Sequence, residues 1–311
     1  MDYIDFDTLV EHLELRNAVP EVDVSDFKLT VPEINRPALQ LTGFYAHFSN
    51  NRVQVIGNVE YTYLSTLDDS VREHNFEEFI SKGIPCIIFT NNNEPHDIEK
   101  KLAIKYNVPM LIANKKTSLF TAEIIRWMNM QLGPTLSIHG VLVDVYGEGV
   151  LITGESGIGK SEAAIELIKR GHRLVSDDVV NIKKVSNAML IGSAPAITKH
   201  LIELRGIGVI DVKSLFGIEC VEDEHPIDMV INLLDWTKSP EQEYDRLGLD
   251  EAYTEYLGNR VVSYSIPVRP GRNLAVIVEA AAVNHRQKKM GYNAALELYR
   301  RVQENIHSGK K

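Results

Sequence analysis

Cysteine is scarce in this sequence. The 311 residues include only two cysteines, Cys86 and Cys220, and each stands alone in an apolar or mixed segment. No pairing pattern is present, so a disulfide framework is excluded and both residues are expected to be free thiols. Free thiols are typical of a reducing compartment, and we therefore expect a cytoplasmic protein.

An excess of positive charge is also lacking. The chain has 33 lysines and arginines against 43 aspartates and glutamates, a net charge of −10. Nonspecific nucleic-acid binding needs a basic surface, so we expect no nucleic-acid partner. The most apolar run, residues 274–283, is too short to span a bilayer and contains Glu279, and the acidic start carries no secretory signal pattern. We expect no membrane partner.

The first half of the chain alternates strand-like and helix-like segments. Strands are predicted at residues 53–57, 84–90 and 108–113, and helices at residues 69–83, 97–106 and 117–132. This alternation favours a small parallel α/β domain. Gly133 and Pro134 then end the last helix, since glycine closes helices and proline does not continue them. The boundary predicts an N-terminal domain of residues 1–132 and a second domain of residues 133–311.

The second domain carries a glycine-rich loop between a strand and a helix. Residues 149–153 are predicted as the strand and residues 161–170 as the helix. The eight residues between Thr153 and Glu162 fit the P-loop pattern G-x-x-x-x-G-K-[ST], which cradles phosphates with backbone N–H groups. They are the candidate nucleotide-binding residues Gly154, Glu155, Ser156, Gly157, Ile158, Gly159, Lys160 and Ser161. In this pattern Lys160 reaches the β- and γ-phosphates, and the Ser161 hydroxyl binds Mg²⁺.

Phosphoryl transfer also needs carboxylates, and the sequence offers two rival positions. Asp177 and Asp178 follow the predicted strand 172–176, at the strand end where ligands lie in such sheets. Asp235 ends the apolar run MVINLLD, which looks like a Walker B strand. An adjacent acidic pair can hold Mg²⁺ with one member and accept a hydroxyl proton with the other. An exposed turn at a strand end explains the pair about as well.

Six motifs follow one another in the second domain: HGVLVD, GESGIGKSE, GHRLVSDDVV, IELRGIGVID, YDRLGLD and PVRPGRNLAVIVEAAA. In this order and spacing they closely resemble the bifunctional HPr kinase/phosphorylase family of bacteria, and the resemblance covers essentially the whole chain. It implies a P-loop kinase core related to phosphoenolpyruvate carboxykinase and a homohexamer. It also implies the substrate HPr, the phosphocarrier of the sugar phosphotransferase system. In the implied kinase reaction, ATP or pyrophosphate donates a phosphoryl group to a serine of HPr. In the implied reverse reaction, inorganic phosphate accepts that group from the serine and pyrophosphate is released. This activity regulates carbon catabolite repression and sugar uptake.

The resemblance also implies roles for single residues. Lys160 acts on the transferred group, Ser161 and Glu203 are magnesium ligands, and Asp178 is the proton acceptor of the kinase direction. His139 and Arg246 match the other active-site residues, and residues 202–211 match the signature needed for both reactions. The loop tied to dephosphorylation matches Pro267, Val268, Arg269, Pro270, Gly271 and Arg272. Because these assignments give the magnesium ligands as Ser161 and Glu203, Asp235 becomes a weaker candidate for metal binding.

Two alternatives remain open at this point. One is a P-loop kinase for a small molecule or a carboxykinase relative, and the other is a nucleotide-sensing module without catalysis. The presence of Asp178 and Glu203 counts against a pure sensor, which needs no proton acceptor. The sequence does not identify an allosteric effector, the HPr docking surface or the role of the N-terminal domain, although the basic residues 285–289 are a candidate docking edge.

Overall fold

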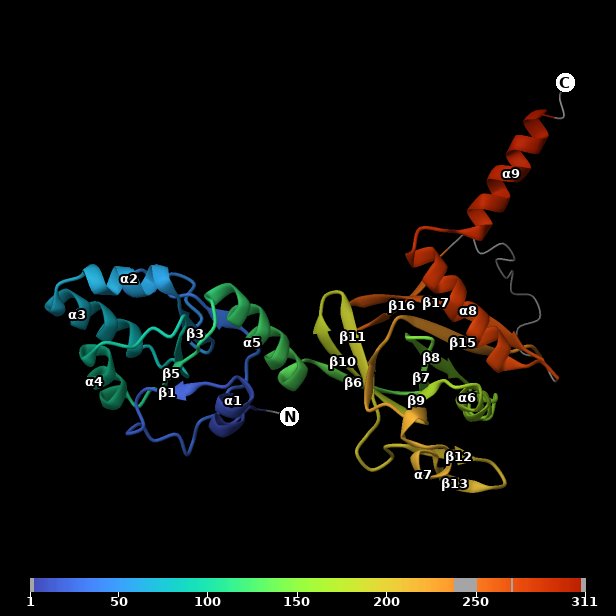
Figure 1. Ribbon diagram of the computed structural model, residues 1–311, viewed down its shortest axis with the longest axis horizontal. Coiled ribbons are helices and arrows are strands. Elements are labelled where there is room, and N and C mark those ends of the chain that lie inside the picture. The colour runs from blue at the N-terminus through green and yellow to red at the C-terminus, as the bar shows by residue number, and fades with distance from the viewer. Residues whose placement is uncertain (1–2, 238–250, 270, 309–311) are drawn as a thin grey trace. The chain divides into compact units, whose positions relative to one another are not determined.

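The computed structural model describes residues 3–237, 251–269 and 271–308. The chain divides into two compact units, Met1–Gly133 and Pro134–Lys311. Figure 1 shows the first unit in blue to green and the second in green to red. Both units combine strands with helices, so the predicted two-domain α/β class is confirmed.

The first unit is built on a five-stranded sheet. Strands β2, β3, β4 and β5 are parallel neighbours, and β1 pairs antiparallel with β5 at the far edge. Their bounds are β1 (Arg16–Asn17), β2 (Ile34–Asn35), β3 (Val53–Ile56), β4 (Ile87–Phe89) and β5 (Met110–Ile112). The three central strands are the three that the sequence predicts, although β3 ends one residue earlier and β4 and β5 are shorter at both ends.

Helices cover both faces of this sheet because side chains of the buried strands alternate between two cores. One core joins Val53, Val55 and Ile88 to residues of α1 and α5, and the other joins Ile87 and Phe89 to residues of α3 and α4. The helices are α1 (Phe6–His12), the 3₁₀ helix η1 (Gln40–Thr42), α2 (Asn58–Thr66), α3 (Asp69–Ile80), α4 (Asp97–Tyr106) and α5 (Thr117–Leu132).

The second unit contains a six-stranded sheet with the order β16-β17-β15-β8-β7-β9. Strands β8, β15 and β17 are parallel, so their carboxyl ends share one edge, where Gly154 pairs with Leu233 and Asp235 with Val268. The strands are β7 (Val141–Val145), β8 (Glu148–Gly154), β9 (Arg173–Ser176), β15 (Met229–Asp235), β16 (Ala252–Tyr256) and β17 (Asn259–Val268).

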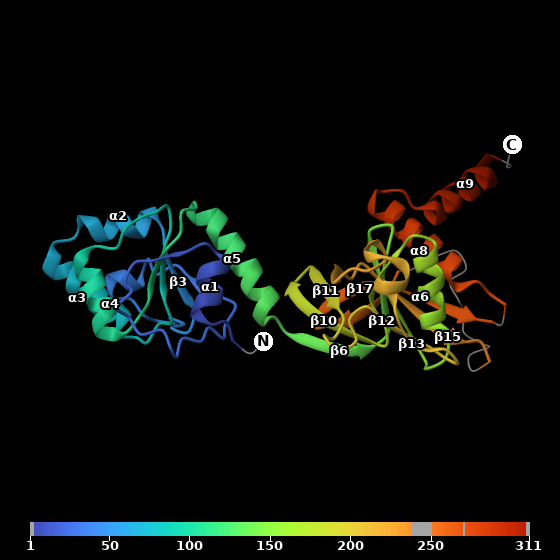
Figure 2. The same ribbon diagram turned by 60° about the horizontal axis from the view of Figure 1, so that its bottom comes forward.

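This sheet lies between helices and a second sheet. On one face α6 (Lys160–Lys169) and α8 (Leu274–Lys289) pack into a core with residues of β7, β8 and β15. On the other face Leu142, Leu151 and Val230 pack against a four-stranded sheet of order β14-β11-β10-β6. Its strands are β6 (Thr135–His139), β10 (Val179–Ser186), β11 (Met189–Ser193) and β14 (Glu224–Pro226). Figure 2 shows α6 and α8 together on one side of the unit.

The remaining described elements lie at the periphery of the second unit. A hairpin of β12 (Leu201–Leu204) and β13 (Gly208–Asp211) is followed by α7 (Val212–Phe216) and the 3₁₀ helix η2 (Ile218–Cys220). Helix α9 (Ala294–Ser308) exposes several large apolar side chains, namely Leu296, Leu298, Tyr299, Val302 and Ile306. Among the described residues, no helix is both long and apolar enough to cross a membrane.

Asp177 and Asp178 lie where the chain breaks between β9 and β10, two strands that belong to different sheets. The basic residues 285–289, the candidate docking edge, form the last turn of α8. His285 in that turn is buried, and Lys289 pairs with Glu148 and Asp228, so these side chains anchor the helix.

Candidate active site

The loop of residues 155–159 connects β8 to α6 and depends on glycine at its bends. Gly154 has a φ of 143° and Gly157 a φ of 82°, conformations that residues with a Cβ atom rarely adopt. Space is limiting as well, since a Cβ atom on Gly154 would lie 2.6 Å from the carbonyl oxygen of Leu233 on the neighbouring strand. The sequence pattern therefore reflects both backbone conformation and strand packing.

The helix that follows the loop presents an anion-attracting end. Gly159 caps α6 and offers no side-chain hydrogen bond to the helix. Unpaired N–H groups and the helix dipole make such an end favourable for negative charge. Lys160 adds a full positive charge, and its Nζ donates hydrogen bonds to the carbonyl oxygens of Gly154 (2.9 Å) and Glu155 (3.0 Å). The arrangement suits a phosphate group.

A cavity of about 130 Å³ lies beside this loop. It brings together eight of the candidate residues named from the sequence, which come from the loop, α6, the β9–β10 bend and the β12–β13 hairpin. Its lining consists of Val141, Ser156, Gly157, Gly159, Lys160, Ser161, Glu162, Asp177, Asp178, Glu203 and Arg205.

Asp177 links three of these elements. Its side chain is buried, and its Oδ1 accepts a hydrogen bond from the Ser161 hydroxyl at 2.8 Å. Its Oδ2 accepts one from the backbone N–H of Glu203 at 3.1 Å. Burial raises the pKa of the Asp177 carboxyl, and the two hydrogen bonds partly oppose that shift. Asp177 thus fixes α6 and the β12–β13 hairpin relative to each other.

Asp178 has the opposite surroundings. Its side chain is 73% exposed, and its Oδ1 lies 3.6 Å from Nδ1 of His139, the last residue of β6. The backbone at Asp178 has a φ of 66°, a left-handed conformation that aspartate tolerates better than most residues. The carbonyl oxygen of Asp178 accepts a hydrogen bond from Gly140 at 3.0 Å, which holds this bend against the end of β6. An exposed carboxylate at a cavity wall is well placed to exchange a proton with a substrate.

The cavity also has the oxygen donors that Mg²⁺ prefers. The Ser161 hydroxyl and the Glu203 carboxyl group both belong to its lining, with Asp177 hydrogen-bonded between their segments. A second cluster, Asp144, Glu222 and His225, places its ligand atoms within 4.8 Å of one another. There, however, the Arg173 guanidinium already donates to Asp144 and lies 3.4 Å from Glu222. Arg173 therefore already balances negative charge that a metal ion would otherwise balance.

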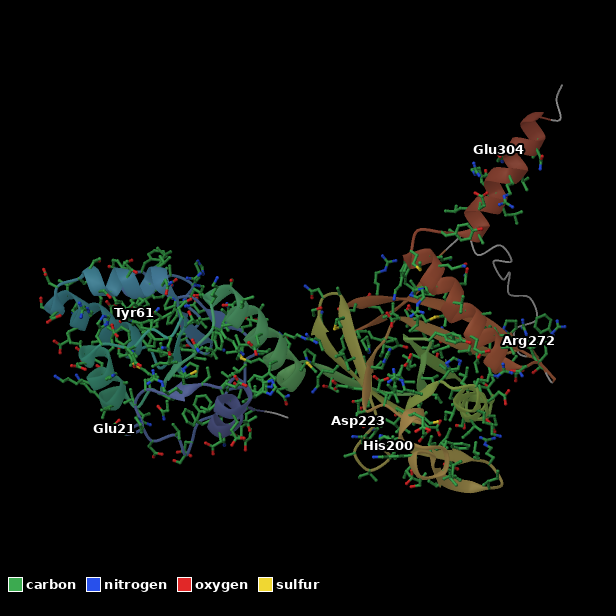
Figure 3. The ribbon with its side chains drawn as sticks, in the orientation of Figure 1. Glu21, Tyr61, His200, Asp223, Arg272 and Glu304 are labelled. Atoms are coloured by element: carbon green, nitrogen blue, oxygen red, sulfur yellow. The ribbon has the colours of Figure 1, made fainter. Side chains whose placement is uncertain are left out.

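The described part of the loop at residues 267–272 lies outside the cavity lining. Pro267 and Val268 end β17, and the Arg269 guanidinium stacks on the Trp236 ring, 3.3 Å from its centroid. Arg272, labelled in Figure 3, donates to the carbonyl oxygen of Pro267 at 2.8 Å and so closes the loop on itself. The loop leads to Leu274, whose Cδ1 lies 3.4 Å from where a Cβ atom of Gly159 would stand. It therefore ends next to the start of α6.

Asp235 does not line the cavity, and its Oδ1 accepts hydrogen bonds from the Thr237 backbone and hydroxyl groups. Arg246 and Pro270 lie outside the described residues. Arg205, which belongs to the signature of residues 202–211, lines the cavity, and its Nη2 donates to the Ser156 hydroxyl at 3.2 Å.

Fold and site together define a two-domain α/β protein with a glycine-rich strand–loop–helix site lined by carboxylates. A family model described as the HPr Serine kinase N terminus matches residues 4–128, and one described as the HPr Serine kinase C-terminal domain matches residues 130–302. The chain therefore belongs to the HPr kinase/phosphorylase family, as the resemblance predicts.

Individual relatives match over nearly their whole length. The HPr kinase/phosphorylase of Lachnoclostridium phytofermentans is 58% identical over 303 residues, which cover 97% of each chain. That of Caldicellulosiruptor bescii is 48% identical over 309 residues, or 99% of each chain. A solved structure of the Hpr(Ser) kinase/phosphatase from Coxiella burnetii is 39% identical, with a TM-score of 0.47, and covers 52% of this chain and 98% of its own.

Proposed function

We propose that this protein phosphorylates a serine of the phosphocarrier HPr with ATP or pyrophosphate, and that it reverses this modification by phosphorolysis. Membership of the family over both domains supports HPr as the partner. One observation carries the chemistry: a single cavity contains the loop lysine, an exposed carboxylate and the oxygen donors for a metal ion. Phosphoryl transfer depends on positioning and charge, and these are the parts it needs.

In the kinase direction, the loop and the α6 N-terminus hold the donor phosphates. Lys160 exchanges its bonds to the Gly154 and Glu155 carbonyl oxygens for bonds to the transferred group. Asp178 accepts the seryl proton while the seryl oxygen attacks the terminal phosphorus, and ADP or phosphate leaves. Ser161 and Glu203 would hold Mg²⁺, which neutralises phosphate charge when it is bound.

The reverse direction uses the same groups. Inorganic phosphate on the loop attacks the phosphorus of phosphoserine, and the bond from phosphorus to the seryl oxygen breaks. Asp178 returns its proton to the departing seryl oxygen, and the two joined phosphates leave as pyrophosphate. His139 is the neighbouring side chain, with its Nδ1 3.6 Å from Oδ1 of Asp178.

Membership of the family also supports proposals about the fold, the assembly and the biological role of the protein. We infer a P-loop core related to phosphoenolpyruvate carboxykinase, a cytoplasmic homohexamer, and a role in carbon catabolite repression and sugar uptake. Residues 1–132 then serve assembly or regulation, and residues 133–311 carry out catalysis. The exposed apolar side chains of α9 favour association, since large apolar surfaces are usually covered in an assembly.

Incubation with ATP, Mg²⁺ and purified HPr tests the proposal. We expect a native-gel shift of HPr and a mass increase of one phosphoryl group on a serine, and we expect Lys160→Ala to abolish both. Binding of ATP without any transfer to HPr would favour the nucleotide-sensing alternative. Transfer to a small acceptor instead of HPr would favour the small-molecule kinase.

A further inference from the structure

Arg205 lies in the turn that joins β12 to β13, directly after Leu204, the last residue of β12. Ile202 of β12 is buried in the core of the second unit at 1% exposure. Glu203 and Arg205, in contrast, both line the cavity. The backbone N–H of Glu203 is held by Asp177, so the hairpin has a fixed position over the loop.

Gly157 provides the place where the Arg205 side chain rests. A Cβ atom on Gly157 would lie 2.4 Å from Nη1 and 2.9 Å from Cζ of Arg205, which is closer than such atoms approach. The absence of a side chain at this one loop position therefore lets the guanidinium lie against the loop backbone. Its Nη2 also donates to the hydroxyl of Ser156, the preceding loop residue.

The guanidinium retains most of its binding capacity. It has five N–H donors, and within the described residues its recorded hydrogen bond is the one to Ser156, with no carboxylate in an ion pair. Lys160 rests on the carbonyl oxygens of Gly154 and Glu155. Two cations thus lie over successive stretches of the same loop, residues 154–155 and 156–157.

We propose that Arg205 is a second phosphate-contacting cation of this site, and that it binds the outer phosphate of ligands with two linked phosphates, such as pyrophosphate. The inference rests on the proposed function. A planar guanidinium matches two oxygens of one phosphate at a time. A single phosphate is held by the loop and Lys160, whereas a linked pair extends along the loop to Arg205. Arg205 therefore sets the preference for diphosphates over inorganic phosphate.

Calorimetric titration with pyrophosphate and with inorganic phosphate, each with Mg²⁺, tests this role. We expect Arg205→Ala to weaken pyrophosphate binding roughly ten- to hundredfold and phosphate binding by less than about threefold. Arg205→Lys keeps the charge without the fork, so an intermediate loss is expected. Arg260→Ala is the matched control. Arg260 is also exposed, but it lies near the start of β17, where it stacks on Tyr253, and it does not line the cavity.

Two results would overturn the inference: pyrophosphate binding to Arg205→Ala as tight as to the unmodified protein, or an equal loss for both anions. If the unmodified protein binds neither anion, the proposed function itself is contradicted. The Gly157→Ala substitution adds a second test, with thermal unfolding as the check on folding. It should weaken pyrophosphate binding strongly in the natural background and less in the Arg205→Ala background, whereas equal losses in both backgrounds contradict the role of Gly157.

Discussion

At the scale of single residues, Asp177 and Asp178 are adjacent in the chain but meet different surroundings. Asp177 is buried and accepts hydrogen bonds from Ser161 and Glu203, whereas Asp178 is 73% exposed beside His139. The break between β9 and β10 separates the two carboxylates, since the left-handed backbone at Asp178 turns its side chain away from the buried position. Asp177 therefore joins segments of the cavity, whereas Asp178 is exposed at its wall.

Replacement of Asp178 by asparagine removes the proposed proton acceptor but keeps the size of the side chain. We expect a loss of roughly a hundred- to ten-thousandfold in both kinase and phosphorolysis rates, with nucleotide binding retained. Transfer of labelled phosphate to HPr measures the first rate, and pyrophosphate release measures the second. Asp223→Asn is the control, because Asp223 pairs with His200 at 3.0 Å outside the cavity (Figure 3). Full kinase turnover in Asp178→Asn would rule out the assigned role.

Replacement of Asp177 by asparagine makes a prediction about stability and pH. Burial raises the pKa of Asp177 above its ordinary value of 3.8, so the folded state binds this proton more tightly than the unfolded state does. The contribution of Asp177 to stability is therefore largest below that value and is lost as the pH rises through the raised pKa. Asparagine does not titrate, so the variant should gain stability relative to the natural protein over this interval.

Thermal unfolding of both proteins without Mg²⁺, across a pH series that starts below 3.8, measures this difference. Asparagine preserves the local geometry, since its oxygen accepts from Glu203 and its amide group donates to Ser161. A difference in stability that does not change with pH would contradict the assignment of the buried proton to Asp177.

At the scale of elements, the end of β17 and the start of α8 form a closed loop held by two arginines. Arg269 stacks on Trp236, and Arg272 donates to the Pro267 carbonyl oxygen. The loop ends beside Gly159, close to the α6 N-terminus. We propose that its arginines bind the phosphoseryl group or the incoming phosphate.

Alanine at either Arg269 or Arg272 should therefore depress phosphorolysis more than kinase activity. In the kinase direction the phosphate donor binds to the loop of residues 154–161 and the accepting serine is uncharged. Phosphorolysis must bring two anions, inorganic phosphate and the phosphoseryl group, into the site. Parallel assays of HPr phosphorylation and of pyrophosphate release on each variant measure the ratio. Equal losses in the two directions would count against this assignment.

The strand that precedes the phosphate loop is fixed by a close approach at Gly149. A Cβ atom at this position would lie 1.8 Å from the carbonyl oxygen of Pro226, the last residue of β14. Gly149→Ala should therefore lower stability by about 1–3 kcal/mol, the usual cost of overpacking, as measured by denaturant unfolding. An unchanged free energy of unfolding would show that β8 and β14 move apart without cost.

Several elements could be predicted from the sequence because their signals are local. Helices α4 and α5 have the predicted bounds, and the loop of residues 154–161 follows from glycine and lysine spacing alone. Helix α2 and the sheet β14-β11-β10-β6 were not predicted. The sheet depends on pairing between strands far apart in the chain, and no local pattern specifies such partners.

The candidate site shows the same division between local and distant information. The residues that fit the P-loop pattern and the acidic pair stand out in the sequence, but the burial of Asp177 and the exposure of Asp178 depend on how β9 and β10 diverge. Arg205 reaches the loop because Gly157 leaves space for it, and that contact joins residues from two separate segments. Neither fact can be derived from spacing alone.

At the scale of the whole molecule, the chain consists of two units with separate cores. The second unit carries every described residue of the cavity. If the family assembly holds for this protein, light scattering should give a mass six times that of the 35.0 kDa chain. A monomer mass at micromolar concentration would contradict the hexamer but not the chemistry of the site.

The reversibility of phosphoryl transfer is the central claim, and one measurement tests it most directly. Purified protein is given Mg²⁺, inorganic phosphate and serine-phosphorylated HPr, and pyrophosphate is measured over time. The account predicts one pyrophosphate for each phosphoserine lost and no reaction when inorganic phosphate is left out. Loss of phosphoserine without pyrophosphate, or no loss at all from a protein that binds phosphate, would contradict it.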